Sequence, residues 1–522
     1  MDDPLFSPPI NKALHLRYWQ RCLRTLLPHH YTPTDSQRMT LGFFIITAID
    51  LLSPSSTSTP TPEQASQPSN NSNKPTTNLL NQTERRTLRQ WVLSCQHPQG
   101  GFCGSPTHVL PPQHQHSANA NIAATYFALL LLAMLAYDED AESAFAGVDR
   151  VKTLQWLRRL QRPEDGSFGE VVYDLPQQPA AGEGTGTGTG NAKVVVGGGK
   201  DMRYCYLAAT IRWILRGGDD DIVPGGEGYV EDIDIDALVA HIRRSQTYDG
   251  GFSESFRHES HAGYAYCAVA ALALLDRPLE SQGVEAKAAG GEGEQTPYYK
   301  RSQALQKGIS DIPGFISFLV SRQFTYLEPS EEDDDEEDDD DDETANFQQA
   351  NLALGADEPP KHIGFNGRCN KVADTCYTWW VLGSLSILGV LDAGSTKNNI
   401  VDPAALKAQR DFLLDKTQHV IGGFGKRPGN PPDIYHSSLG LAALATLGDP
   451  GLKRFDPGLC VSADTVRKIE KGRRGLTRRS NNRGEAGADS SSGNGSRVDF
   501  GKGLLDMAVS MRGDERPEWL VG

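Results

Sequence analysis

Gln246-Thr-Tyr-Asp-Gly250-Gly-Phe252 is the stretch that decides the fold, because its pattern returns along the chain. Each copy has a glutamine, a few polar residues, and then Gly-Gly-Phe or Gly-Ser-Phe. A fifth copy is divided, with an acidic insertion between Gln323 and Gly364-Phe365. Self-similarity at long and fairly regular spacing is typical of a repeat architecture. The other complete copies begin at Gln96, Gln161 and Gln418.

Two kinds of helical pattern flank each copy. The stretch before it is amphipathic, as at 151–160, where apolar residues recur at i, i+3 and i+4. The stretch after it is rich in apolar and small residues, as at 262–275 and 378–391, and a helix that is apolar nearly all round is buried. Glycines end one helix and turn the chain into the next. The sequence therefore predicts an all-α fold, an α/α toroid with polar-faced outer helices around apolar inner ones.

We expect residues 1–522 to form a single toroid domain that is interrupted by low-complexity insertions. Apolar residues make up only 38% of the chain, as insertions that dilute a packed core would produce. None of these segments can bury a core, so we expect all of them to be disordered. The predicted insertions lie at about 53–78, 182–199, 281–296, 328–361 and 473–497.

An unbroken run of thirteen acidic residues at 331–343 carries most of the net charge of −16. Without this run the remaining charge is −3, so the folded part is nearly neutral and lacks the basic character of a nucleic-acid-binding protein. We expect the run to be a solvated, disordered loop. The alternative is an acidic segment that docks a basic partner.

Cysteine usage and hydropathy predict a soluble, cytoplasmic protein. Eight cysteines without paired spacing do not resemble a disulfide framework. The segment Met1-Asp-Asp-Pro4 lacks the basic and apolar regions of a signal peptide. The longest apolar stretch, 122–136, is too short to span a bilayer.

The predicted starts of the inner helices carry unusual polar side chains. In a toroid these ends converge on one rim of the central cavity. Helix N-termini present free N–H groups and a partial positive charge, which favours an anion such as diphosphate. The segments are Asp201-Met-Arg203, His258-Glu-Ser-His261, Asp374-Thr-Cys376-Tyr377 and Asp433-Ile-Tyr-His436.

Asp374 and Cys376, with the distant His436, make a candidate zinc site. Positions i and i+2 of a helix point apart, so both side chains could reach one metal only if Asp374 is the helix cap. Three protein ligands would leave a fourth position open, as in catalytic zinc sites. The alternative is a capping aspartate followed by an ordinary buried cysteine.

The other candidates also have structural explanations when each is taken alone. Arg368 and Lys371 fit a solvated basic turn. His261 fits a hydrogen-bonded structural histidine, and the Trp379-Trp380 pair fits a hydrophobic core.

Read together, these residues follow a known family. The segment Gly364-Phe-Asn-Gly-Arg-Cys-Asn-Lys-Val-Ala-Asp-Thr-Cys-Tyr-Thr-Trp-Trp380 closely resembles the zinc segment of protein prenyltransferase β subunits. Further motifs occur in the family's order, so the resemblance covers most of the chain outside the insertions. They are Arg17-Tyr-Trp-Gln-Arg-Cys22, Asp201-Met-Arg203, the stretch 243–261 and the stretch 422–436.

The resemblance implies an enzyme with one Zn²⁺ per β chain, held by Asp374, Cys376 and His436. The zinc would keep a substrate cysteine as the thiolate, which attacks C1 of an isoprenoid diphosphate. Further groups would bind the diphosphate, the lipid and the end of the peptide. They are His261, Arg368, Lys371 and Tyr377 for the diphosphate, Tyr264 and Trp380 for the lipid, and Arg203 for the peptide.

Two positions resemble type I geranylgeranyltransferases rather than farnesyltransferases. Thr40 stands where farnesyltransferases have a tryptophan that closes the lipid pocket, so a longer isoprenoid would fit. Lys426 stands where they have an aspartate that helps to hold magnesium. Its ammonium could neutralise the diphosphate directly, and we expect magnesium not to be required.

The resemblance therefore implies a catalytic β subunit that transfers geranylgeranyl from geranylgeranyl diphosphate to proteins with a C-terminal CaaX box ending in Leu, such as small GTPases. The partner would be a helical-repeat α subunit in a heterodimer. The rival enzymes are the farnesyltransferase and Rab geranylgeranyltransferase β subunits. Terpene cyclases share toroids with similar repeats, but they lack the Asp-x-Cys…His set and need carboxylates placed for acid chemistry, which this sequence does not show. A non-catalytic toroidal binding module is the alternative outside the enzyme class.

Overall fold

The computed structural model divides the chain into two compact units, Met1–Arg479 and Ser480–Gly522, and the fold described below is that of the first. The described residues are 4–54, 79–111, 119–175, 193–216, 224–226, 228–279, 297–326, 360–369, 371–391 and 402–485. The acidic run 331–343 and most of the predicted insertions lie outside them, so the disorder of those segments remains a prediction.

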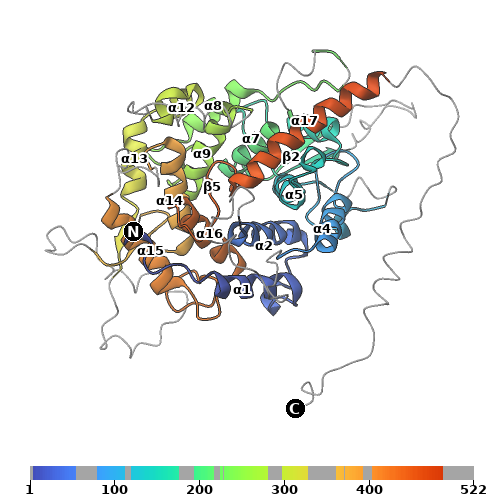
Figure 1. Ribbon diagram of the computed structural model, residues 1–522. Helices are drawn as coiled ribbons and strands as arrows, with labels where there is room; N and C mark the ends of the chain where they lie inside the picture. Colours follow the sequence, from blue (N-terminus) through green and yellow to red (C-terminus); the bar gives the residue numbers. More distant parts are fainter. Residues whose placement is uncertain are drawn as a thin grey trace, which may run out of the picture. The chain divides into compact units, whose positions relative to one another are not determined.

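Six inner helices form a closed ring in the described part of the chain (Figure 1). Each contacts the next along the sequence, and the last contacts the first. This arrangement confirms the predicted α/α toroid. The inner helices are α2 (Arg38–Leu52), α5 (Ile122–Leu135), α7 (Met202–Arg216), α9 (Ala262–Leu275), α14 (Thr375–Leu388) and α16 (Ile434–Thr446).

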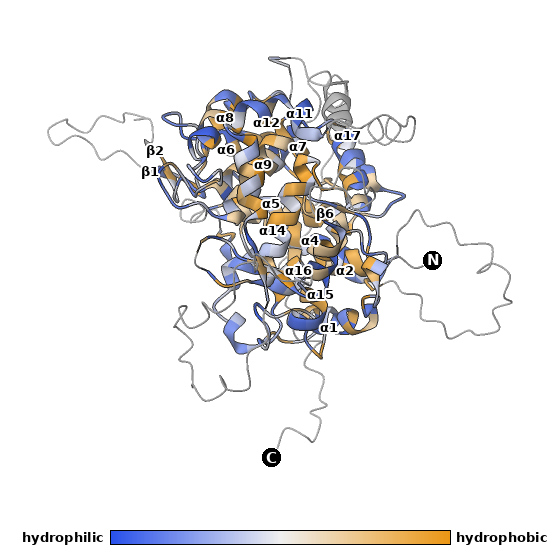
Figure 2. Ribbon diagram, turned by 90° about the vertical axis from the view of Figure 1, so that its left-hand side faces the viewer, coloured by the Kyte–Doolittle hydropathy of each residue, from blue (hydrophilic) through white to orange (hydrophobic). Residues whose placement is uncertain are grey.

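The inner helices are buried because they are apolar nearly all round. In α9 every residue from Ala265 to Leu274 is buried, and five of those ten are alanines that let α7 and α14 approach closely. Figure 2 shows the same contrast, since α5 is largely orange while α8 and α12 carry blue segments. The expected inner helix 262–275 is confirmed. The one expected at 378–391 begins earlier, at Thr375, and ends at Leu388 because Gly389 adopts a left-handed φ of 74°.

The outer helices pack against the ring by their apolar faces. They include α6, which confirms the amphipathic helix expected at 151–160. Most have their main contacts with an inner helix, whereas the main contacts of α15 include strand β4. They are α1 (Lys12–Arg24), α4 (Gln82–Ser94), α6 (Arg150–Arg159), α8 (Ile235–Arg244), α11 (Tyr298–Arg301), α12 (Gln303–Gly308), α13 (Ile312–Val320) and α15 (Pro403–Asp411).

In three copies of the repeat, the glutamine links its turn to the outer helix that follows. Gln246 forms an antiparallel bridge with Phe252, and its Oε1 accepts hydrogen bonds from the backbone N–H groups of Ser310 and Asp311 at 2.7 and 3.0 Å. Asp311 is the N-cap of α13. Equivalent hydrogen bonds join Gln96 to the N-cap Asp149 of α6, and Gln161 to the N-cap Asp234 of α8.

The glycines of the repeat allow the turn to approach the next helix. Gly250 has a φ of 86°, and a Cβ there would lie 2.2 Å from the backbone oxygen of Gly314 in α13. Only glycine fits such a position without strain. The repeat motif therefore marks the places where the turn of one helix pair packs against the outer helix of the next pair.

Two copies of the repeat behave differently from the rest. The divided copy is joined again in space, because Gln323 pairs with Phe365 between strands β3 (Gln323–Thr325) and β4 (Ile363–Phe365). This pairing confirms the expected fifth copy. The last copy meets the start of the chain instead of a later helix, since Gln418 Oε1 lies 2.9 Å from Nε2 of the buried His15 in α1.

Two predicted insertions are shorter than expected. The segment 182–199 overlaps strand β2 (Lys193–Gly197), which pairs with β1 (Val171–Leu175). The segment 473–497 overlaps helix α17 (Ala463–Glu485), where Arg473 is buried and donates a hydrogen bond to the carbonyl of Trp213 at 3.0 Å. Both boundaries were wrong because the composition of the insertions continues into regular structure that adjacent contacts stabilise.

A short hairpin and several single turns complete the described elements. No helix among the described residues has both the length and the hydropathy needed to cross a bilayer. The hairpin is β5 (Phe455–Asp456) with β6 (Val461–Ser462), and the turns are η1 (Pro4–Phe6), η2 (His29–Tyr31), η3 (Asp35–Gln37), η4 (Pro106–His108), η6 (Ala141–Ser143) and the π-helical η8 (Phe412–Thr417).

Candidate active site and metal centre

Capping side chains fix the starts of three inner helices. Asp374 is the N-cap of α14 and accepts a hydrogen bond from the Cys376 N–H at 2.8 Å. Asp433 caps α16 through the His436 N–H, also at 2.8 Å. His261 caps α9, because its Nδ1 accepts from the Gly263 N–H at 3.0 Å. The helix starts thus hold the candidate site residues in fixed positions.

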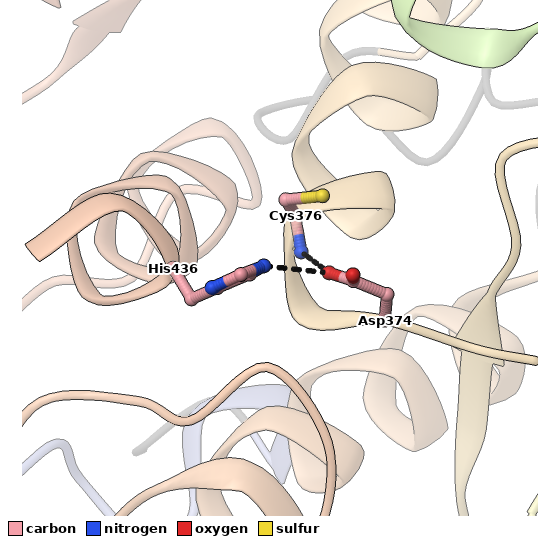
Figure 3. A group of neighbouring side chains, drawn as sticks. All are labelled: Asp374, Cys376 and His436. Carbon is pink, nitrogen blue, oxygen red and sulfur yellow. Dashed lines mark hydrogen bonds and ion pairs between the residues drawn. The ribbon is translucent and has the colours of Figure 1, made fainter. Parts of the chain in front are cut away.

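The three candidate metal ligands meet where α14 and α16 begin (Figure 3). One ligand atom from each of Asp374, Cys376 and His436 can be chosen so that all three lie within 4.8 Å of one another. Asp374 occupies the cap position that the i, i+2 spacing required. Both Asp374 and Cys376 are only 6% exposed, so the three side chains form a shielded cluster.

Charge in this cluster favours a cation. His436 Nδ1 lies 2.6 Å from Asp433 Oδ2, and its Nε2 lies 3.2 Å from Asp374 Oδ1. Burial lowers the pKa of His436, but the two carboxylates outweigh it and raise the pKa to about 9. Burial, followed by Asp374, raises the pKa of the Cys376 thiol well above its ordinary value. A protonated His436 thus places positive charge beside the two carboxylates, and a bound metal ion could supply that charge instead.

The donor set fits a divalent metal such as zinc. Sulfur, imidazole nitrogen and carboxylate oxygen are all ordinary zinc ligands, and three of them leave one position for a substrate. Asp433 provides the carboxylate that orients a metal-binding histidine through its other ring nitrogen. Both the three candidate ligands and the Asp433 carboxylate that contacts His436 therefore fit a zinc site.

A cavity of about 520 Å³ adjoins the cluster. Asp374 reaches its wall, and four basic side chains face it from two segments. This cavity brings together all the residues expected to bind diphosphate. Its lining is Glu254, His258, Glu259, Ser260, His261, Tyr264, Arg368, Lys371, Val372, Asp374, Tyr377, Lys426 and Arg427.

His261 and Tyr377 form a directional pair in this cavity. Nδ1 of His261 accepts a backbone N–H, so in the neutral ring Nε2 carries the proton and donates it to Tyr377 Oη at 3.0 Å. Burial, followed by Arg368, lowers the pKa of His261 to about 4. Burial raises the pKa of Tyr377 above its ordinary value. A neutral His261 therefore leaves the phenol proton of Tyr377 free to be donated to a ligand.

Arg368 has an acidic partner within the cavity. Its Nη1 donates to Glu259 Oε2 at 2.7 Å, and the two side chains are 42% and 55% exposed. Neither side chain is enclosed by protein, so an incoming anion could reach the guanidinium. The ion pair holds Arg368 at the wall between α9 and the segment that precedes α14.

Three of the expected substrate residues lie outside the cavity lining. Arg203 forms a bidentate ion pair with Asp201, with N–O distances down to 2.5 Å, and lies over the ring of Tyr264. The half-buried Trp380 packs on Tyr266 with a ring separation of 5.0 Å. Thr40 is half-buried in the first turn of α2. The roles of these three residues remain predictions.

Sequence reasoning missed three residues that the site contains. Asp433 was seen only as part of a helix start, although a carboxylate three residues before His436 could have indicated its hydrogen bond. Glu259 stands two residues before His261, and Arg427 directly follows Lys426. Nothing in their spacing indicated that Glu259 would pair with Arg368 across more than a hundred residues.

Comparison with known proteins shows the family to which the chain belongs. Residues 10–461 match the prenyltransferase alpha-alpha toroid domain. The chain belongs to this prenyltransferase family.

The relatives in this family include two type-1 enzymes. The geranylgeranyl transferase type-1 subunit beta of Arabidopsis thaliana is 26% identical over 87% of this chain and 92% of its own length. That of Dictyostelium discoideum is 24% identical over 87% of this chain and 95% of its own length. A protein farnesyltransferase subunit beta of Pyricularia oryzae is 24% identical over 84% of this chain and 63% of its own length.

A solved structure supports the fold. Candida albicans protein geranylgeranyltransferase-I, complexed with GGPP, aligns with a TM-score of 0.58 and 23% identity. The alignment covers 89% of this chain and 99% of that chain.

Proposed function

We propose that this chain is the catalytic β subunit of a type I protein geranylgeranyltransferase. The observation that carries the proposal is the meeting of the Asp374–Cys376–His436 cluster with a basic cavity at one rim of the toroid. The reaction would move a geranylgeranyl group from geranylgeranyl diphosphate to the cysteine of a C-terminal CaaX box ending in Leu. Full-length similarity to two type-1 β subunits supports this choice.

The cluster would hold one zinc ion. Bound zinc would supply the positive charge that keeps a substrate thiol ionised at neutral pH. Asp433 would keep the proton on Nδ1 of His436 and so leave Nε2 free as a ligand. Burial of Asp374 and Cys376 would limit competition by water.

The basic cavity would bind the diphosphate and stabilise it as a leaving group. The carbon–oxygen bond at C1 breaks while the sulfur–carbon bond forms, so negative charge grows on the departing oxygen. Tyr377 would donate its phenol proton in a hydrogen bond, and Arg368, Lys371 and Lys426 would supply positive charge. Donors that are fixed before the reaction stabilise such charge most effectively.

The lipid and cofactor choices rest on two residues. Thr40 is smaller than the tryptophan of the farnesyl enzymes and would leave room for an additional isoprene unit. Lys426 would place an ammonium beside the diphosphate, so magnesium would not be needed. Tyr264 and Trp380 would contact the lipid, and Arg203 the end of the peptide.

A helical-repeat α subunit would complete the enzyme, residues 1–522 would act as one toroid domain with insertions, and the substrates would be cytoplasmic proteins such as small GTPases. The similarity to a farnesyltransferase subunit makes that enzyme the second candidate.

Co-expression with a matching α subunit tests the function. The purified complex should transfer geranylgeranyl to a Leu-ended peptide faster than to a Ser-ended one, and should use farnesyl diphosphate poorly. Preference for farnesyl diphosphate and the Ser-ended peptide would indicate a farnesyltransferase instead. Transfer only to Rab proteins would indicate the Rab enzyme. A complex that binds lipid diphosphate without any transfer would indicate a binding module.

A further inference from the structure

Arg427 is a cavity residue that the family resemblance did not assign. It follows Lys426 in the turn after the last repeat and lines the same cavity as His261 and Arg368. Its side chain is half-buried, and its Nε is closed off from solvent without a hydrogen-bond acceptor among the described residues. A buried donor without an acceptor is unfavourable, so a rotation of the guanidinium that brings this donor onto an acceptor bound in the cavity would be favoured.

The backbone around Arg427 is fixed against the metal cluster. Thr375, which lies between two of the candidate metal ligands, donates its N–H to the Lys426 carbonyl at 3.0 Å and its hydroxyl to the Gly425 carbonyl at 2.7 Å. The carbonyl of Arg427 itself accepts the Asn430 N–H at 3.1 Å. These hydrogen bonds hold the turn against the start of α14, so the backbone that carries Arg427 has a fixed position at the cavity wall.

Arg427 differs from the other arginine of the cavity. Arg368 already has a carboxylate partner in Glu259. The Nε of Arg427, by contrast, has no hydrogen-bond partner among the described residues. A planar guanidinium can bind two oxygens of one phosphate at once, whereas the ammonium of Lys426 acts as a point charge.

We propose that Arg427 is a further diphosphate-binding residue, which binds the leaving group from the same turn as Lys426. This inference rests on the proposed function. The carboxylate at the end of the peptide substrate is the other anion that a guanidinium at this position could bind. The position of Arg427 beside Lys426, within the cavity that holds His261 and Tyr377, favours the diphosphate.

Binding of inorganic diphosphate to the zinc-loaded α–β complex, measured by calorimetry, tests the proposal. Arg427→Gln should weaken binding roughly 10-fold to 100-fold, as loss of a charge-assisted hydrogen bond does. Arg427→Lys should restore part of it, because the charge returns without the fork. Arg158→Gln, on the exposed face of α6, should bind like the wild type. The KM for the peptide should stay unchanged in all three.

Each possible result of these measurements supports or contradicts the proposed role of Arg427. Diphosphate binding by Arg427→Gln at the wild-type affinity would overturn the inference, and so would an effect on the peptide KM alone. If Arg427→Gln does not fold, as judged by circular dichroism, Arg427→Lys decides, since undiminished diphosphate affinity and unchanged lipid diphosphate KM would count against a bidentate role. A wild-type complex that binds no diphosphate at all would refute the proposed function instead.

Discussion

His261, the N-cap of α9, and Tyr377 of α14 are joined by a 3.0 Å hydrogen bond between imidazole Nε2 and phenol oxygen. The backbone N–H of Gly263 occupies the other ring nitrogen, so a neutral His261 acts as the donor in this pair. Two inner helices are thus linked at the wall of the cavity, and the proton of Tyr377 is directed away from His261.

Tyr377→Phe removes that free donor without removing the ring. We expect turnover to fall by about 10²-fold to 10³-fold, the usual cost of losing one fixed donor to a developing negative charge. Single-turnover transfer rates measure the effect, and Tyr173→Phe in the exposed β1–β2 hairpin is the control. Since the pKa of His261 is lowered to about 4, the ring stays neutral and its ionisation should not appear in the rate between pH 6 and 8. A full rate in Tyr377→Phe would remove Tyr377 from the reaction.

Glu259→Gln should strengthen the binding of inorganic diphosphate. The carboxylate of Glu259 competes with the ligand for Arg368, and an exposed ion pair of this kind contributes about 0.2–1 kcal/mol, so the Kd should fall by up to about 5-fold. Glu254→Gln removes the same charge from the cavity wall without touching Arg368 and should have a smaller effect. Equal effects of the two variants would show that only the total charge matters. Weaker binding in Glu259→Gln would show that the pair positions Arg368.

Cys376→Ala should abolish zinc binding and transfer. One of three ligands is lost, and the remaining two cannot hold the ion firmly. Mass spectrometry of the metal content should find one zinc per β chain in the wild type and far less in the variant, with helix content unchanged. Cys369→Ala alters the exposed cysteine of the same segment and should keep its zinc. Full zinc retention by Cys376→Ala would rule out the ligand assignment.

Thr40→Trp should shift the preference from geranylgeranyl to farnesyl diphosphate. An indole in the first turn of α2 would fill the space of the last isoprene unit. The ratio of kcat/KM for the two lipids measures the shift, and Thr25→Trp places the same group on the exposed end of α1 as a control. An unchanged ratio would mean that Thr40 does not line the lipid pocket.

Lys426→Asp should make turnover depend on magnesium. The carboxylate would add negative charge beside the diphosphate, and together they would make a hard oxygen site for this ion. We expect little activity without magnesium and recovery at millimolar concentrations, while the wild type should survive magnesium chelation with zinc retained. Lys426→Ala separates loss of the charge from gain of the site and should not recover. A wild type that needs magnesium as strongly as the Asp variant would favour a farnesyltransferase-like site.

The fold was predictable because each repeat contains the residues that determine its contact with the following helix. Gln246 specifies the contact with the next helix, and Gly250 the close approach that this contact requires. The same reasoning placed Asp374 at a helix cap, since the spacing to Cys376 allowed no other way for both to reach one metal. Local rules were sufficient wherever the interaction partners lie within one or two elements.

Contacts that depend on the closed ring could not be predicted. Arg368 and Glu259 come from different helix pairs, and no periodicity relates them. Arg473 was assigned to an insertion because its surroundings are rich in basic and polar residues, yet it is buried against Trp213. Composition indicates whether a segment can form structure by itself. The partners and burial of these side chains are instead determined by elements far away in the sequence.

The contact between His15 and Gln418 spans 403 residues and joins the two ends of the ring. Closing so large a loop costs entropy that no local contact offsets beforehand, and folds rich in distant contacts form slowly. Ring closure should therefore come late in folding. Until then the apolar inner helices stay open to other chains, which is a state prone to aggregation. An early-binding partner that covers this open state would shape the yield of folded protein as much as the catalysis that follows.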